Sequence, residues 1–145
     1  RFAQRDDAVQ SKIFFRGLVE PLGDGLANLV NHSVTSCESG PSPLAYFLSS
    51  LALCQCVHYA EHAAAEGLRL NALRIDVRGR FQMAHPRQCE AIDYAVVVDS
   101  PEPKEIVERL ARTVAADCYV TGTLKRACEV RGSLVLNGTP LGVFD

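Results

Sequence analysis

Six cysteines are the residues of this 145-residue chain with the clearest capacity for chemistry. They are Cys37, Cys54, Cys56, Cys89, Cys118 and Cys128. The N-terminal residues show no basic-then-apolar leader, so we expect a cytoplasmic protein. In that compartment cysteines serve as core residues, metal ligands or redox groups more often than as a structural disulfide framework.

A helical stripe of thiol and imidazole groups is the first candidate site. Cys54, His58 and His62 are four residues apart, which places them on one helix face. Such a stripe can hold a metal, or it can pair a nucleophilic Cys54 with His58 as its base. Alternatively, Cys54 is a small core residue and the histidines face solvent. No Cys-x-x-Cys pair accompanies the stripe, so we expect no metal and no cofactor.

The other cysteines differ in what their positions allow. Cys118 follows one predicted helix and precedes another turn, where a helix N-terminus can lower the pKa of a thiol. Cys56 lies two residues from Cys54, so the two sulfurs diverge on a helix and Cys56 belongs to the core or to an interface. For Cys37, Cys89 and Cys128 we expect only packing roles.

The element that must carry Cys54 is a long helix predicted over Pro43–Glu66. Ser42 can cap its start, Pro43 fits the first helical position, and Gly67 can end it. The first half of this helix is apolar or small on every side. We therefore expect it to be buried all round, which a chain of this size achieves with the help of a second subunit.

The remaining pattern predicts an α+β fold in a single domain over residues 1–145. An amphipathic helix is expected after Ser100 and up to Asp117, and a short helical turn near Thr121–Arg126. Strands are expected at Lys12–Val19, Leu26–Val34, Leu70–Phe81, Ala91–Val98 and Cys128–Leu136. The first two strands suggest a hairpin around Gly23–Gly25.

The charge balance excludes two classes of partner. The chain has 15 basic and 17 acidic residues, a net charge of −2, so nothing favours nucleic acid or an anionic membrane surface. No apolar run is long enough to span a bilayer.

Motifs around the two leading cysteines resemble those of a known family. Gly40-Pro41-Ser42-Pro43 precedes the long helix that carries Cys54. Cys118-Tyr119-Val120-Thr121-Gly122-Thr123-Leu124 is similar to a Cys-Pro-Val-x-x-Thr-Leu motif. Together with Val77-Arg78-Gly79 and Ile92-Asp93-Tyr94, these motifs resemble the OsmC/organic hydroperoxide resistance family from about Gly40 to Leu136.

The resemblance implies a fold and a mechanism. The implied fold has antiparallel sheets, a long central helix and a second helix, in an intertwined homodimer. Cys54 is then the thiol that attacks an organic hydroperoxide, and Cys118 is the resolving thiol that condenses with its sulfenic acid. An external dithiol restores both thiols by exchange.

The chain also departs from the family's pattern. Peroxidases of the family carry a Glu at the helix start, where this chain has Leu44 or Ala45. They also carry an N-terminal Arg, to which Arg16 cannot be assigned, and a Pro where this chain has Tyr119. We hypothesise that His58 compensates by stabilising the Cys54 thiolate. Two alternatives remain open: hydrolysis of a thioester or acyl substrate by Cys54 with His58, and non-catalytic binding of a small molecule.

Overall fold

The computed structural model describes residues 8–16, 43–82 and 85–144. The expected strand Leu26–Val34, the Ser42 cap, Cys37 and the side chain of Arg16 lie outside the described residues. The elements in chain order are β1 (Ala8–Arg16), α2 (Pro43–Glu66), β2 (Ala72–Gln82), β3 (Gln88–Asp99), α3 (Lys104–Asp117), α4 (Tyr119–Leu124), β4 (Glu129–Leu136) and β5 (Thr139–Phe144).

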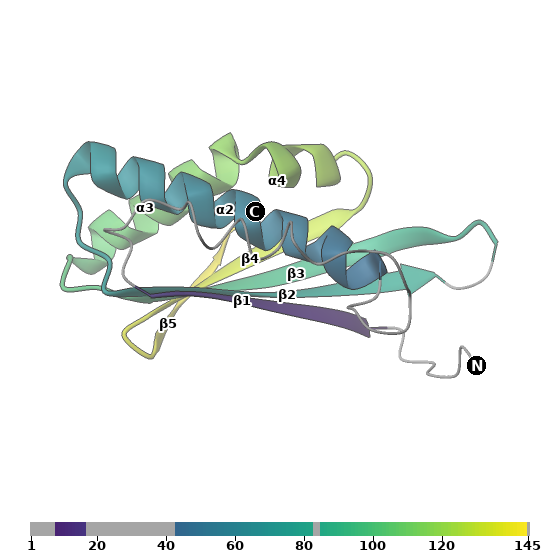
Figure 1. Ribbon diagram of the computed structural model, residues 1–145, viewed down its shortest axis with the longest axis horizontal. Coiled ribbons are helices and arrows are strands. Elements are labelled where there is room, and N and C mark those ends of the chain that lie inside the picture. The colour runs from purple at the N-terminus through teal and green to yellow at the C-terminus, as the bar shows by residue number, and fades with distance from the viewer. Residues whose placement is uncertain (1–7, 17–42, 83–84, 145) are drawn as a thin grey trace.

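Five strands form one sheet in the order β1-β2-β3-β4-β5, and helices cover one of its faces (Figure 1). The α+β class is therefore confirmed. One detail of the expected antiparallel arrangement is wrong, because β3 and β4 run parallel. The chain reaches β4 from β3 through α3 and α4, and a crossover of this kind returns to the sheet in the same direction.

One further expectation about strands needs correction. Strand β1 pairs along its whole length with β2, and the expected hairpin partner of β1 lies outside the described residues. The strand that ends at Leu136 does not close the sheet, because β5 pairs with it in antiparallel register. The connecting turn contains Asn137 at φ 49° and Gly138 at φ 81°, and Asn-Gly is a favoured sequence for such a two-residue hairpin turn.

The long helix α2 has the predicted bounds and ends at Gly67, whose φ of +67° suits a helix stop. It packs one side against the sheet, with Leu48, Leu51 and Tyr59 fully buried. Within the described residues, helices α3 and α4 also pack against it, but Phe47 in its first half is 38% exposed. In the described part of one chain the first half of α2 is therefore not buried all round, and coverage by a second subunit stays a prediction.

Candidate active site around Cys54 and Cys118

Two cysteines from distant parts of the sequence meet beside α2. Cys54 lies on α2, and Cys118 lies at the junction between α3 and α4. Their sulfur atoms and a ring nitrogen of His58 all lie within 4.8 Å of one another. The neighbouring Cys118 thiol raises the pKa of Cys54. The structure thus brings together the two cysteines that the resemblance implied as a pair, and it places His58, expected beside Cys54, near both of them.

Two side-chain contacts fix the position of Cys118 against α2. On one side of it, the buried amide of Gln55 donates a 3.1 Å hydrogen bond to Oγ1 of Thr121. On the other side, His62 Nε2 lies 3.0 Å from Oδ2 of Asp117. Because these contacts bracket Cys118 in sequence, they hold its backbone beside the helix turn that carries Cys54.

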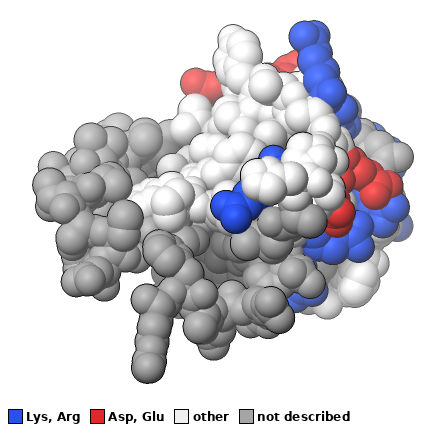
Figure 2. All heavy atoms as spheres, turned by 90° about the vertical axis from the view of Figure 1, so that its right-hand side faces the viewer, with Lys and Arg blue, Asp and Glu red and all other residues white. Residues whose placement is uncertain are grey.

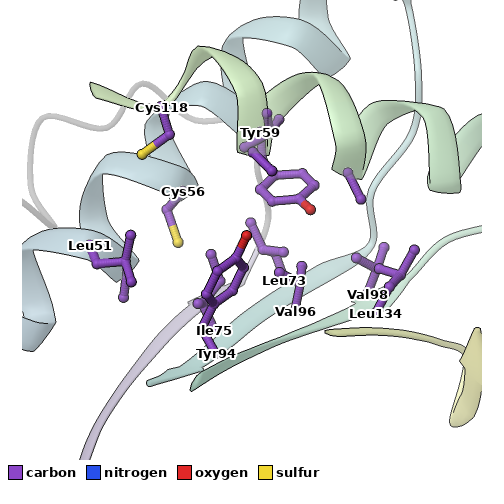
Figure 3. Packing of buried hydrophobic residues seen from close by; sticks show 14 of the residues in the cluster. Leu51, Cys56, Tyr59, Leu73, Ile75, Tyr94, Val96, Val98, Cys118 and Leu134 are labelled. Atoms are coloured by element: carbon purple, nitrogen blue, oxygen red, sulfur yellow. The ribbon is translucent and has the colours of Figure 1, made fainter. Parts of the chain in front are cut away.

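Cys118 itself is almost inaccessible to solvent. It is 1% exposed, and its sulfur accepts a 3.5 Å hydrogen bond from the backbone N–H of Thr121. In Figure 3 its sulfur points toward α2, whereas the Cys56 sulfur points from α2 toward the sheet. Cys56 is fully buried, and burial raises its pKa to about 12. This orientation confirms that Cys54 and Cys56 diverge and assigns Cys56 to the core.

Opposing influences set the pKa of Cys54. Burial raises this pKa, and so does contact with the Cys118 thiol, whereas the backbone N–H groups of Val120 and Tyr119 lower it. The net result is a pKa above the ordinary value, because burial has the largest effect. Cys54 is half-buried and therefore reachable, but it is a thiol rather than a thiolate near neutral pH.

His58 has neighbours on several sides of its ring. Its Nδ1 lies 3.5 Å from Oε2 of Glu61, and the Tyr119 ring centroid is 5.8 Å from its own. The Tyr119 ring therefore forms one side of the site. His62 lies beside His58 but contacts Asp117, so the expected stripe of Cys54, His58 and His62 is not the group that converges.

Sequence reasoning missed the polar residues that hold the site together. Gln55, Thr121 and Asp117 received no role, although a polar Gln55 inside an apolar helix segment was a signal for a buried partner.

A second pair of thiols lies outside this site. Cys89 contacts Cys128, and burial together with that contact raises the pKa of Cys89 to about 12. Both cysteines pack against the core from half-buried positions, as expected for packing residues, but their contact was not foreseen.

An apolar cavity of about 410 Å³ lies at the N-terminal end of α2. Leu44, Phe47, Phe81 and Cys89 line it together with Gln82, Arg87 and Gln88. In Figure 2, which views this end of the molecule, the described part of the surface shows a broad uncharged area with charged groups of both signs at its side. None of the helices in the described part combines the length and apolarity that crossing a bilayer requires.

Comparisons with known proteins agree with this architecture. Residues 36–132 match the family model described as OsmC-like protein. No curated protein matches the chain. An OsmC-like protein from Mycoplasma pneumoniae is 23% identical, with a TM-score of 0.61 over 71% of this chain and 78% of that one.

Two further solved structures share the fold. An OsmC-like hydroperoxide resistance protein from Jannaschia sp. is 23% identical, with a TM-score of 0.54 over 72% of this chain and 73% of that one. An OsmC-like protein of unknown function from Vibrio cholerae is 13% identical, with a TM-score of 0.57 over 88% of this chain and 98% of that one. Because the family model covers most of the chain and includes both cysteines of the site, this protein belongs to the OsmC-like protein family.

Proposed function

We propose that this protein is a thiol-dependent peroxidase that reduces organic hydroperoxides with Cys54 and Cys118. The observation that carries the proposal is the contact between these two thiols, whose sulfur atoms lie within 4.8 Å across 64 residues of sequence. Family membership and the likeness to a protein described as hydroperoxide resistance protein support the same chemistry.

The proposed cycle uses two thiols and consumes one hydroperoxide. The Cys54 thiolate attacks the outer oxygen of the O–O bond, the alkoxide leaves and takes a proton to become an alcohol, and Cys54 becomes a sulfenic acid. The Cys118 sulfur then attacks the Cys54 sulfur, which forms a disulfide and releases water. An external dithiol returns both cysteines to thiols by two exchange steps and leaves as a disulfide.

The roles follow from exposure and local hydrogen bonding. Cys54 is half-buried, and two backbone N–H groups beside it lower its pKa. These groups therefore raise the fraction of thiolate above that of a thiol equally buried without them. Cys118 is nearly inaccessible, so a hydroperoxide in solution reaches Cys54 first. The apolar cavity begins at Phe47, two turns before Cys54 on α2, and suits a substrate with an apolar substituent.

The test is to follow the loss of cumene hydroperoxide with reduced protein and dithiothreitol. We expect turnover in the wild type, none in Cys54→Ser, and unchanged turnover in the control Cys128→Ser. Absence of turnover in the wild type, or equal turnover in Cys54→Ser, would refute the proposal.

A second candidate function is acyl transfer to Cys54, with His58 as the base. The observation that favours it is a carboxylate, an imidazole and a thiol in sequence. Glu61 lies beside Nδ1 of His58, and a ring nitrogen of His58 lies near the Cys54 sulfur, as in a nucleophile–base–acid triad. A covalent acyl adduct on Cys54 after incubation with p-nitrophenyl acetate, and its loss in His58→Ala, should identify this chemistry by intact-mass measurement.

A further inference from the structure

The convergence of His58 with the two thiols is more than a dithiol reaction requires. A sulfenic acid and a disulfide need two sulfur atoms, yet three donor atoms lie within 4.8 Å of one another. We propose that Cys54, His58 and Cys118 form a binding site for a thiophilic divalent cation, with Zn²⁺ as the representative ion. This proposal does not depend on the peroxidase activity.

The spacing of the donors fits a tetrahedral zinc ion. Zinc lies at about 2.3 Å from thiolate sulfur and about 2.0–2.1 Å from imidazole nitrogen, so neighbouring ligands are about 3.5–3.8 Å apart. The three donor atoms are already within 4.8 Å, so shifts of about 1 Å close the site, within the reach of side-chain rotation. Two sulfurs and one imidazole form a known zinc ligand set that leaves a fourth position for water.

The backbone supports the ligands on rigid elements. Cys54 and His58 are four residues apart on α2, the spacing at which a helix presents two ligands to one zinc ion. Cys118 comes from another segment, but the Gln55–Thr121 and His62–Asp117 contacts hold that segment against the same helix. The third ligand is thus positioned before the metal arrives, which reduces the cost of binding.

In zinc sites, a carboxylate usually contacts the ring nitrogen of a histidine ligand that does not bind the metal, and Glu61 lies in that position beside His58. Oε2 of Glu61 lies 3.5 Å from Nδ1 of His58, which favours the tautomer with its proton on Nδ1 and the lone pair on Nε2. A carboxylate on the far nitrogen orients the ring and makes it a better ligand. Glu61 is exposed, so its replacement should test this role without disturbing the core.

Metal binding and disulfide formation exclude each other at this site. A bound zinc ion occupies both sulfur atoms as thiolates, whereas a Cys54–Cys118 disulfide leaves His58 as the only ligand. The cation should therefore bind only the reduced protein, protect both thiols from alkylation, and leave when the thiols are oxidised.

The experiment is titration of the reduced, metal-free full-length protein with Co²⁺ and Zn²⁺. We expect one Co²⁺ per chain, with a thiolate-to-cobalt charge-transfer band that Zn²⁺ abolishes. Cys118→Ser and His58→Ala should weaken zinc binding by more than the about 10–100-fold expected for Glu61→Gln. The control Cys128→Ser should bind as the wild type does, and far-UV circular dichroism should show that every variant is folded.

Other outcomes overturn the proposal clearly. No charge-transfer band, or zinc affinity unchanged in both His58→Ala and Cys118→Ser, excludes the site. A loss in Cys128→Ser alone would place the metal at the Cys89–Cys128 pair instead. Zinc binding by a protein that fails to turn over cumene hydroperoxide would reject the proposed peroxidase function and leave the metal site standing.

Discussion

The buried amide of Gln55 on α2 donates a 3.1 Å hydrogen bond to the Thr121 hydroxyl on α4, 66 residues later in the sequence. Gln55 is the residue after Cys54, and Thr121 also donates its backbone N–H to the Cys118 sulfur. This contact, together with the one between His62 and Asp117, therefore sets the relative position of both thiols.

Breaking this contact should cost stability and peroxidase turnover together. Gln55→Leu leaves the buried Thr121 hydroxyl without its partner, and we expect a loss of about 1–3 kcal/mol in the free energy of unfolding. Urea denaturation measures the loss, and the rate of disulfide formation should fall because Cys118 is less well placed. Ser50→Ala, which removes an exposed hydrogen bond to Phe47, is the control and should change neither. An unaffected Gln55→Leu variant would show that the contact does not position the site.

The pKa of Cys54 predicts how its reactivity depends on pH. Since burial raises this pKa above the ordinary 9.0, the thiolate fraction is still climbing throughout the neutral range. Alkylation of Cys54 by iodoacetamide should accelerate about tenfold per pH unit between pH 6 and pH 8, without a plateau. Cys89, with a pKa of about 12, should react more slowly at every pH. Peptide mass spectrometry resolves the two sites, and a plateau for Cys54 near pH 6 would mean that His58 or a partner subunit activates it.

Residues at its two ends were sufficient to predict the bounds of α2, the helix that carries Cys54. Pro43 and Gly67 mark where α2 begins and ends, because proline suits a first helical turn and glycine adopts the positive φ of a helix stop. The hairpin to β5 had a signal of the same kind in Asn137-Gly138, between two apolar segments. The last expected strand ended at Leu136, and β5 was not expected, because this dipeptide was not recognised as a hairpin turn.

The meeting of Cys54 and Cys118 could not be derived from spacing. They are 64 residues apart, and their distance depends on how α3 and α4 cross from β3 to β4. Only the resemblance to a family suggested the pair. The residues that enforce it, such as Gln55 and Asp117, act through tertiary contacts that no local pattern specifies.

Two glycines offer a matched test of packing around the sheet. A Cβ on Gly132 would lie 2.6 Å from the Tyr94 side chain and 2.8 Å from the Phe144 ring, so Gly132→Ala should destabilise the protein by about 1–3 kcal/mol. A Cβ on Gly122 in α4 meets nothing within 4 Å, and Gly122→Ala should stabilise the helix by about 0.5–1 kcal/mol. The melting temperature measured by thermal denaturation should therefore fall in Gly132→Ala and rise in Gly122→Ala. A change in the same direction in both variants would contradict the described packing.

Apolar groups left uncovered beside the site lead us to expect a homodimer. Phe47, on the helix that carries Cys54, is 38% exposed, and Tyr119, the residue after Cys118, is 80% exposed. Light scattering after size exclusion should give twice the 15.8 kDa mass of one chain. Phe47→Glu should shift that mass toward the monomer, whereas Glu105→Gln on the exposed start of α3 should not. A monomer at every concentration tested would reject the dimer.

The burial of Cys118 predicts what happens when the resolving thiol is removed. In Cys118→Ser the first attack on the hydroperoxide should still occur, because Cys54 keeps its own exposure and the backbone N–H groups of Tyr119 and Val120. The sulfenic acid then lacks the thiol that condenses with it in the wild type, and the Cys56 sulfur points into the core (Figure 3). Dimedone should trap one equivalent on Cys54 in this variant and little in the wild type, where the disulfide forms first. Equal dimedone labelling of both proteins would mean that Cys118 does not resolve the intermediate, whatever the distance between the two sulfurs.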